Sequence, residues 1–324
     1  LNDHADAMGF DAIQIGGMLA WIMECVSDRL IDPADFGFPP GETLRFEGFT
    51  ADPGEFDVVG DSMINARYAM AVIDAMLGDP RAEPFRHGIR EAAKELNRRR
   101  PDTRPGERAV FLSHGDRGCM VPNQYFVPGM GSPMPIMGKY YVFYGANILA
   151  PEEVGRRNVE RMVYELISDN VGMCRFHRQW TEPLANEIAR EHFGLDVDFR
   201  RHHFELARRI NAREGAKSVP WETERLTDML TNYLRWIVED GKDVGEIEAW
   251  IDHERLDHAL VPSTQGEPIE RPADPGHVTE PQRLALAFWH AIKHGQEEAF
   301  AAGPEAIQPI LTPAQQRAES ADGP

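Results

Sequence analysis

The chain has 324 residues, 42% of them hydrophobic, which is enough to bury the core of one large domain or of two ordinary ones. It carries 34 Lys and Arg against 53 Asp and Glu, a net charge of −19, and this acidic balance argues against nucleic acid or a membrane surface as a partner. Three cysteines are too few for a disulfide framework, and no run reaches the roughly 18 apolar residues of a membrane span. These features favour a cytoplasmic protein.

The chain does not begin with Met, and its first residues, Leu1 to His4, have the character of the inside of a structural element. No basic segment followed by an apolar one marks a signal peptide. We therefore expect position 1 to be a break in a longer protein, whose upstream part could carry any targeting signal.

Helical periodicity dominates the first hundred residues. Residues 11–30 place apolar side chains on one broad face, where the pair Gly16-Gly17 predicts close packing. Residues 32–58 carry Asp-Pro and Pro-Gly turn signals. Two further helices are predicted, one from an N-cap at Asp61-Ser62 to about residue 77 and one over residues 84–96.

Residues 97–135 are different, because Pro and Gly recur throughout them. A long irregular stretch inside a compact protein is more often functional than idle. We expect residues 106–138 to form a loop that lines a pocket.

The second half returns to helical patterns. Proline and two acids at residues 151–153 open a helix that runs to about residue 168. Further helices are predicted at 181–193, 198–213, 220–239, 243–258 and 280–302. The prediction is therefore a mainly α, multihelical fold, with helical domains at 1–105 and 106–303 and a flexible tail at 304–324.

Two segments, residues 6–11 and 169–174, share the pattern Asp-x-x-Gly, an apolar residue, then Asp or Cys. A carboxylate accepts two parallel hydrogen bonds from a planar N–H/NH₂ edge, such as that of a pterin. A glycine three residues later removes the side chain that would hold the ring away from the backbone. The same pattern is common at helix ends, where it forms only a cap. The residues alone leave both interpretations open.

The three cysteines differ in their surroundings. Cys174 is followed by basic residues at 175–178, which favour a thiolate, although a buried structural cysteine is the alternative. Because the chain has no Cys-x-x-Cys, a [4Fe–4S] cluster here would need three thiolates from elsewhere. Cys25 falls in an apolar helical stripe and is predicted to be core, whereas Cys119 could line the pocket.

Four segments, taken in order, resemble the aldehyde:ferredoxin oxidoreductase family of tungsten or molybdenum bis-pterin enzymes. Residues 2–16 resemble the family segment that ends in G-L-D-T-I-S-T-G, and residues 87–96 resemble its stretch G-V-R-x-A-A-K. Residues 169–177 are similar to its second pterin motif, D-x-x-G-L-C, and residues 208–215 to its N-x-R-E-G motif. The resemblance covers roughly residues 1–215. It implies the two C-terminal helical domains of that fold, with the N-terminal β-rich domain absent.

The resemblance also implies roles for the residues of the two segments. Asp6 and Asp169 resemble the acids that grip the two pterins, and the neighbouring pterin contacts would be Gly9, Asp11, Gly172 and Met173. Cys174 resembles the fourth ligand of a [4Fe–4S] cluster, whose other three ligands would lie upstream of position 1. The implied reaction oxidises a small aldehyde to a carboxylic acid and passes electrons through the cluster to ferredoxin or a similar carrier.

One departure from the family leaves the substrate open. The family has N-R-G followed shortly by a His and a Lys near the substrate, whereas residues 116–118 here read Asp-Arg-Gly with neither behind them. His114 or Lys139 could substitute, and Glu24 is a candidate pocket carboxylate; surface or structural roles are the alternatives. A reductase of a non-aldehyde substrate and a non-catalytic helical subunit that binds a partner or cofactor therefore stay open as functions.

Three basic clusters lie at residues 98–100, 156–157 and 200–203. They could dock an acidic electron carrier by local steering, and solvated helix faces are the alternative.

Overall fold

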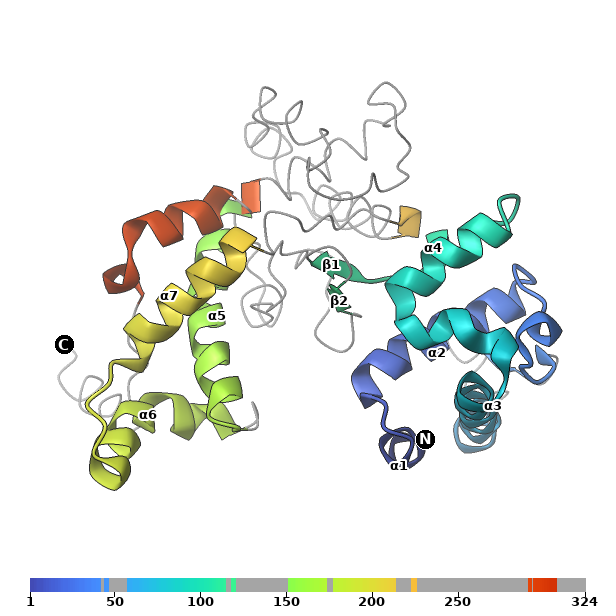
Figure 1. The fold of residues 1–324 in the computed structure, drawn as a ribbon, viewed down its shortest axis with the longest axis horizontal. Coiled ribbons are helices and arrows are strands. Elements are labelled where there is room, and N and C mark those ends of the chain that lie inside the picture. Colours follow the sequence, from blue (N-terminus) through green and yellow to red (C-terminus); the bar gives the residue numbers. More distant parts are fainter. Residues whose placement is uncertain are drawn as a thin grey trace, which may run out of the picture. The chain divides into compact units, whose positions relative to one another are not determined.

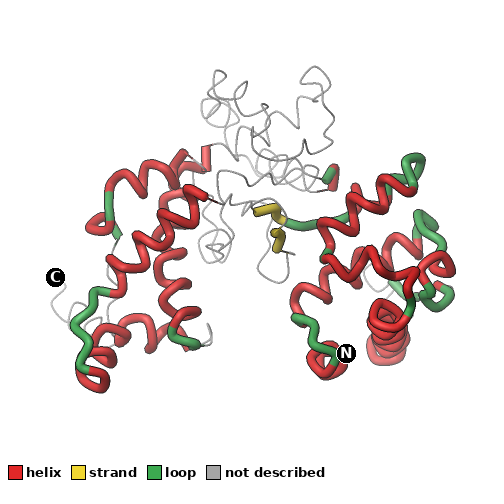
Figure 2. Tube along the Cα trace, viewed as in Figure 1, coloured by secondary structure: helices red, strands yellow, loops and turns green. Residues whose placement is uncertain are grey.

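The computed structural model describes residues 1–41, 44–46, 57–114, 118–120, 151–173, 177–213, 223–225, 291–292 and 294–307, with only the backbone of 112–114, 120, 178, 179 and 213. Within these ranges the structure is mainly helical, as predicted (Figures 1 and 2). The chain divides into two compact units, Leu1–Tyr125 with Val219–Met229, and Phe126–Ser218 with Leu230–Pro324. The domain boundaries expected from the sequence stay a prediction.

The described part of the first unit is built mainly from helical elements. Its α-helices are α1 (Asn2–Ala7), α2 (Ala12–Ser27), α3 (Val58–Gly78) and α4 (Ile89–Arg99), and its 3₁₀ elements are η1 (Pro33–Phe36), η4 (Pro80–His87) and η5 (Pro105–Arg108). One antiparallel strand pair, β1 (Leu112–His114) and β2 (Gly118–Met120), lies within the stretch predicted to be irregular, with His114 opposite Gly118.

The N-cap of helix α3 (Val58–Gly78) lies four residues before the predicted one at Asp61. The observed cap is Asp57, whose carboxylate accepts the backbone N–H groups of Val59 (3.2 Å) and Gly60 (2.9 Å). These N–H groups have no partner inside a helix, so a carboxylate at this position fixes where the helix starts.

The prediction of one helix over residues 84–96 was wrong. Element η4 ends at His87, Gly88 adopts φ 88° and ψ 165°, and α4 starts at Ile89. A residue with a side chain rarely adopts that conformation, and Gly88 uses it to break the helix in two.

The prediction of close packing at Gly16 was also wrong. Gly16 is exposed, and no atom of the described chain lies within 4 Å of a Cβ placed there.

A cluster of aromatic side chains packs in the core of the first unit. Phe85 contacts Phe36, Phe38 and Trp21, with ring centroids 5.1, 5.2 and 6.0 Å away. Trp21 also donates its indole N–H to the carbonyl of Pro105 at 2.9 Å. Helix α2 is thereby tied to η4 and to η5, which follow it by many residues in the sequence.

The second unit is organised around one long buried helix. Helix α5 (Pro151–Asn170) packs against α6 (Arg178–Phe193) and α7 (Phe199–Arg213), and η10 (Pro304–Ala306) follows a helical stretch at 294–302 (Figure 1). The three predicted helices at 151–168, 181–193 and 198–213 are confirmed with slightly shifted ends. The predictions for 226–290 and for the tail from residue 308 lie outside the described residues.

Two glycines let the backbones of this unit approach closely. A Cβ on Gly155 would lie 2.0 Å from the carbonyl oxygen of Ile292, and a Cβ on Gly295 would lie 2.0 Å from that of Glu152. No side chain can occupy either point, so α5 and the stretch near residue 295 meet backbone to backbone.

Candidate functional site

The first Asp-x-x-Gly segment forms the C-terminal turn of α1. The N–H of Gly9 donates to the carbonyl of Asp6 (3.0 Å), and the N–H of Phe10 donates to the carbonyl of Ala5 (3.0 Å). Gly9 has φ +83°. These two bonds and the left-handed glycine constitute a Schellman motif.

The second segment closes α5 in the same way. The N–H of Gly172 donates to the carbonyl of Asp169 (3.1 Å), the N–H of Met173 donates to that of Ser168 (2.9 Å), and Gly172 has φ +72°. We call the turns at residues 5–10 and 168–173 the first and the second capping turn.

The two capping turns also share their pattern of exposure. In each, the Asp and the Gly are exposed and the residue after Gly is half-buried. The residue before Gly is apolar yet exposed, at 42% for Met8 and 45% for Val171. No described atom lies within 4 Å of a Cβ placed on either glycine, so a planar group could lie directly against the backbone there.

The hydrogen-bond pattern by itself is not specific to the motif. Helix α2 ends with the same pair of bonds, from Arg29 to Val26 (3.1 Å) and from Leu30 to Cys25 (2.8 Å), and Arg29 has φ 58°. In that turn Val26 and Arg29 occupy the positions of the Asp and the Gly.

Helix α6 also ends with an exposed acid, Glu191, three residues before an exposed left-handed glycine, Gly194, that no described atom crowds. Its bonds differ, since Gly194 donates to Arg190 and Leu195 donates to Ala189. The combination of the Asp, the open glycine and the two Schellman bonds therefore distinguishes the two capping turns from these two helix ends.

The last position of the motif differs between the segments. Asp11 is the N-cap of α2, and its carboxylate accepts the N–H of Gln14 at 2.7 Å. One of its two oxygens thus has a structural partner, and the residue is exposed. Cys174, at the matching position of the second segment, lies outside the described residues.

A buried charged network underlies the second capping turn. Arg161 donates through Nη1 to Glu182 (3.1 Å), pairs through Nη2 with the other carboxylate oxygen of Glu182, and donates through Nε to Glu165 (3.0 Å). The hydroxyl of Ser168 donates to Glu182 at 3.0 Å. These four residues are at most 6% exposed. Nothing in the sequence periodicity marks this network, because Arg161 and Glu182 belong to different helices.

The first capping turn is anchored differently. His4 of α1 contacts Asp74 of α3 through Nε2 at 2.9 Å, on a surface where the Asp74 side chain is 58% exposed. Ala5 is buried and Phe10 packs against the apolar core of the first unit.

Glu24, a candidate catalytic acid, is bound by arginine. Both of its carboxylate oxygens pair with the guanidinium of Arg225, at 3.2 Å for the longer contact, and Arg108 lies 3.8 Å away. This pairing favours an anchoring role for Glu24.

Burial, followed by the charges of Glu24 and Asp28, raises the pKa of the Cys25 thiol to about 12. Cys25 is fully buried, as predicted for a core residue.

The other candidates near the strand pair are only partly placed. The backbone of His114 lies in β1, but its side chain, like all of Lys139, is outside the described part of the chain. The carbonyl of Gly118 accepts a hydrogen bond from the buried guanidinium of Arg90 at 2.8 Å. Cys119 is half-buried and packs against the first unit's core.

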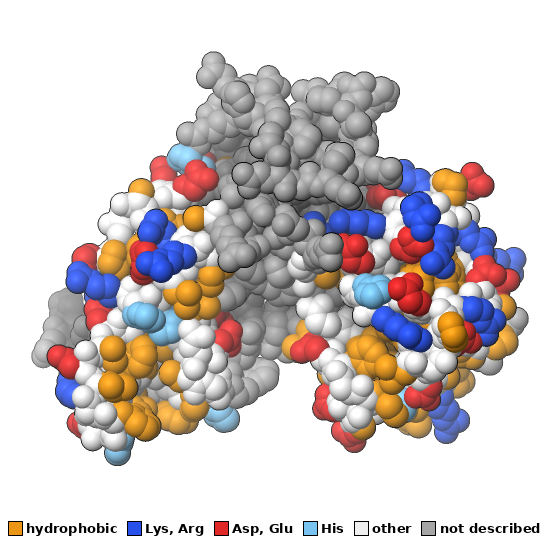
Figure 3. Space-filling model, in the orientation of Figure 1, with side chains coloured by type: hydrophobic (Ala, Val, Ile, Leu, Met, Phe, Trp, Pro, Cys, Tyr) orange, Lys and Arg blue, Asp and Glu red, His pale blue; other side chains and the backbone are white. Residues whose placement is uncertain are grey.

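The basic clusters are matched by acids. Arg98 and Arg99 both bind Glu95, and Arg100 pairs with Asp35. The remaining pairs join Arg156 and Arg157 to Glu153, and Arg200 and Arg201 to Glu305. Figure 3 shows blue side chains interleaved with red ones on the face in view. Solvated, internally paired helix faces account for these arginines.

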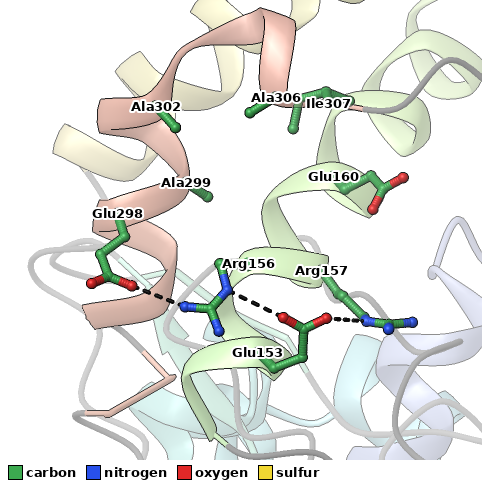
Figure 4. A pocket seen from close by; sticks show the side chains of 9 residues that line it. All are labelled: Glu153, Arg156, Arg157, Glu160, Glu298, Ala299, Ala302, Ala306 and Ile307. Atoms are coloured by element: carbon green, nitrogen blue, oxygen red, sulfur yellow. Dashed lines mark hydrogen bonds and ion pairs between the residues drawn. The ribbon is translucent and has the colours of Figure 1, made fainter.

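A cavity of about 490 Å³ opens in the second unit beside the start of α5 (Figure 4). Its two guanidiniums are already neutralised, since Glu153 binds both Arg156 (3.2 Å) and Arg157 (2.6 Å) and Glu298 binds Arg156 (3.0 Å). Burial raises the pKa of Glu160 at its edge. None of the predicted site residues lines this cavity.

The described residues show neither a metal-ligand cluster nor a membrane-spanning helix. They contain no group of three or more His, Cys, Asp and Glu that could hold a metal ion. Among them no helix is long and apolar enough to cross a membrane.

Comparison with known proteins identifies the family. Over 245 residues, 71% of this chain, it is 32% identical to the glyceraldehyde-3-phosphate:ferredoxin oxidoreductase of Pyrococcus furiosus, of which it covers 36%. The chain is a distant homologue of part of the aldehyde:ferredoxin oxidoreductase family. An uncharacterized protein of Methanocaldococcus jannaschii is 30% identical over 236 residues, 70% of this chain and 38% of that protein. The chain thus spans little more than a third of the length of these two relatives. No family model and no solved structure matches it.

Proposed function

We propose that this chain is the helical portion of a cytoplasmic tungsten or molybdenum bis-pterin oxidoreductase. The complete enzyme would oxidise an aldehyde to a carboxylic acid and pass two electrons through a [4Fe–4S] cluster to ferredoxin. The observation that carries the proposal is the duplicated capping turn, with an exposed carboxylate and an open left-handed glycine, in a homologue of a ferredoxin-linked oxidoreductase.

The donor edge of a pterin fits the chemistry of these turns. The last carbonyls of a helix have no partner within the helix and carry its partial negative charge. Asp6 and Asp169 add an exposed carboxylate to this end of α1 and α5. A surface made of acceptors suits the N–H and NH₂ groups of a pterin, and the glycine permits contact between ring and backbone.

The chain's own residues would then divide the work as follows. Asp6, Gly9 and Asp11 hold one pterin, whereas Asp169, Gly172 and Met173 hold the other. Cys174 supplies the fourth thiolate of the cluster. The remaining cluster ligands would come from the part of the enzyme that this chain does not span. When bound, the metal supplies Lewis acidity to the substrate oxygen. His114 is the proposed acid–base group, and Glu24 is the second candidate.

A second function is favoured by one specific observation. The turn at Arg29 makes the same hydrogen bonds with Val26 and Arg29 at the positions of the Asp and the Gly, so the backbone geometry of a capping turn needs no ligand to explain it. If the two Asp-x-x-Gly segments are only helix caps, the chain is a helical subunit that binds a partner without catalysis. A reductase acting on a non-aldehyde substrate would keep the cofactor sites and differ in the substrate pocket.

Metal analysis of the full-length native protein tests the proposal. We expect about one tungsten or molybdenum and about four iron atoms per chain. Asp169→Asn should lower the tungsten or molybdenum content, because the amide replaces one acceptor oxygen with a donor. Asp28→Asn is the control, since Asp28 is also an exposed acid at the end of a helix but lies outside the motif. A folded native protein with neither metal favours the binding subunit.

A further inference from the structure

Ser168 belongs both to the second capping turn and to the buried network. Its carbonyl accepts the N–H of Met173 at 2.9 Å, and its hydroxyl donates to Glu182 at 3.0 Å. The turn is therefore coupled to the ion pair of Arg161 and Glu182 through a single residue.

Stability alone does not account for the network. The side chains of Arg161, Glu165 and Glu182 are 6%, 1% and 2% exposed, so three charged groups have been removed from water. Replacing such a group of ions by well-packed apolar side chains is often neutral or stabilising. A forked arginine–carboxylate pair instead fixes distance and direction, which apolar contacts leave free.

The network also joins two stretches of chain. Ser168 ends the buried part of α5, and Glu182 lies in the second turn of α6. Near the start of α6, Thr181 donates to the carbonyl of His177 at 3.2 Å. The Ser168–Glu182 bond thereby connects the chain just before residue 169 with the chain just after residue 177, and Cys174 lies between them in the sequence.

We propose that Arg161, Glu182 and Ser168 are positioning residues for the cofactor-binding turn at 169–173. They hold the Asp169 carboxylate and the Gly172–Met173 backbone at a fixed place relative to α6. This inference rests on the proposed function. It adds that retention of the metal cofactor depends on a buried network that does not itself touch the cofactor.

The test uses three variants of the full-length native protein. Ser168→Ala removes only the hydroxyl that links turn and ion pair, and Glu182→Gln removes the charge. Glu153→Gln is the matched control, because it removes a carboxylate that pairs with Arg156 and Arg157 near the opposite end of the same helix. Amide hydrogen exchange at Gly172 and Met173 and the rate at which tungsten or molybdenum is lost on dialysis are measured for each.

In Ser168→Ala, which removes one hydrogen bond, we expect exchange at the two turn amides to accelerate about 5-fold. Metal should be lost faster than from the wild type, while circular dichroism and the control variant stay unchanged. Unchanged turn exchange in both network variants overturns the positioning role. Faster exchange with wild-type metal retention overturns the link to the cofactor. A wild-type protein without tungsten or molybdenum overturns the proposed function, and the exchange data then report on the turn alone.

Discussion

The two capping turns have the same backbone but are mounted on different supports. In the first unit the turn is fixed by Phe10 against an apolar core and by the surface pair of His4 and Asp74. In the second unit it is fixed by Ser168 and the buried pair of Arg161 and Glu182.

The comparison shows that the motif encodes the backbone conformation of the turn, whereas the support beneath the turn differs between the two copies. Glycine in a left-handed conformation and the two backbone hydrogen bonds are local, so both copies have them. The second turn is held in place by residues outside the motif, whereas the first is held partly by Phe10, which belongs to the motif itself. We expect the second turn to be the more sensitive to mutation at a distance, because losing one partner of a buried ion pair leaves a charge without compensation.

The largest expected effect is that of Glu182→Ala. It leaves the buried guanidinium of Arg161 without its forked partner, which should lower the free energy of unfolding by about 3–5 kcal/mol in guanidinium denaturation. Asp74→Ala breaks the corresponding surface pair of the first unit and should cost less than about 1 kcal/mol. Equal losses in the two variants would show that the two supports do not differ.

Gly155→Ala should come next, at about 1–3 kcal/mol, because the added methyl meets backbone atoms that cannot rotate away. Thermal unfolding measures the loss. Gly16→Ala is the opposite control: Gly16 is exposed within α2 and should gain about 0.5–1 kcal/mol from the higher helix propensity of alanine. A stabilised Gly155→Ala variant would contradict the backbone contact in the second unit.

Gly9→Ala and Gly172→Ala should each cost about 1–2 kcal/mol, since alanine is strained at positive φ. No described atom crowds either position, so the two losses should be alike in denaturant titrations. Arg29→Gly should act in the other direction, by roughly 1 kcal/mol, because it relieves the same strain at the end of α2. Clearly unequal losses at Gly9 and Gly172 would mean that the two turns are not equivalent.

A pH effect is expected from the second unit. Burial lowers the pKa of His203, outweighing its hydrogen bond to the carbonyl of Phe199 (2.8 Å), and His202 lowers it further. A depressed folded-state pKa means that the unfolded chain takes up the proton first. Stability is therefore complete above the unfolded value of about 6.5 and falls as the pH drops through it. The unfolding midpoint of His203→Gln should change less between pH 7.5 and 5.5 than that of the wild type.

Local signals in the sequence predicted much of the secondary structure. Pro151 with its following acids opens α5, and the apolar stripes of α2 and α7 appear at helical spacing. The sequence pattern gave the wrong helix boundaries where the start or the end of a helix depends on the conformation or capping bonds of a single residue. The segment with turn signals at 32–58 includes Asp57, although it caps α3, and the glycine at 88 divides a segment whose composition favours a continuous helix.

The site was predictable only in part. Each copy of its acid–glycine pattern spans only six residues, so both copies can be found from the sequence alone. The strand pair, the fork between Glu24 and Arg225, and the network below Ser168 are absent from the prediction. The strand pair is a short hairpin in a stretch whose composition predicts a loop. The fork and the network join residues of different elements, up to 201 positions apart for Glu24 and Arg225, and no local pattern encodes such a contact.

The sequence by itself determined the helical class, the two capping turns and the resemblance to a family of metal–pterin oxidoreductases. These follow from short-range physics, since helix periodicity, N-caps and a left-handed glycine each involve a few neighbouring residues. Only the tertiary structure decided that one turn rests on an apolar core and the other on buried charges. That choice depends on which side chains meet when water is excluded, because ions can be buried only where partners converge from separate helices.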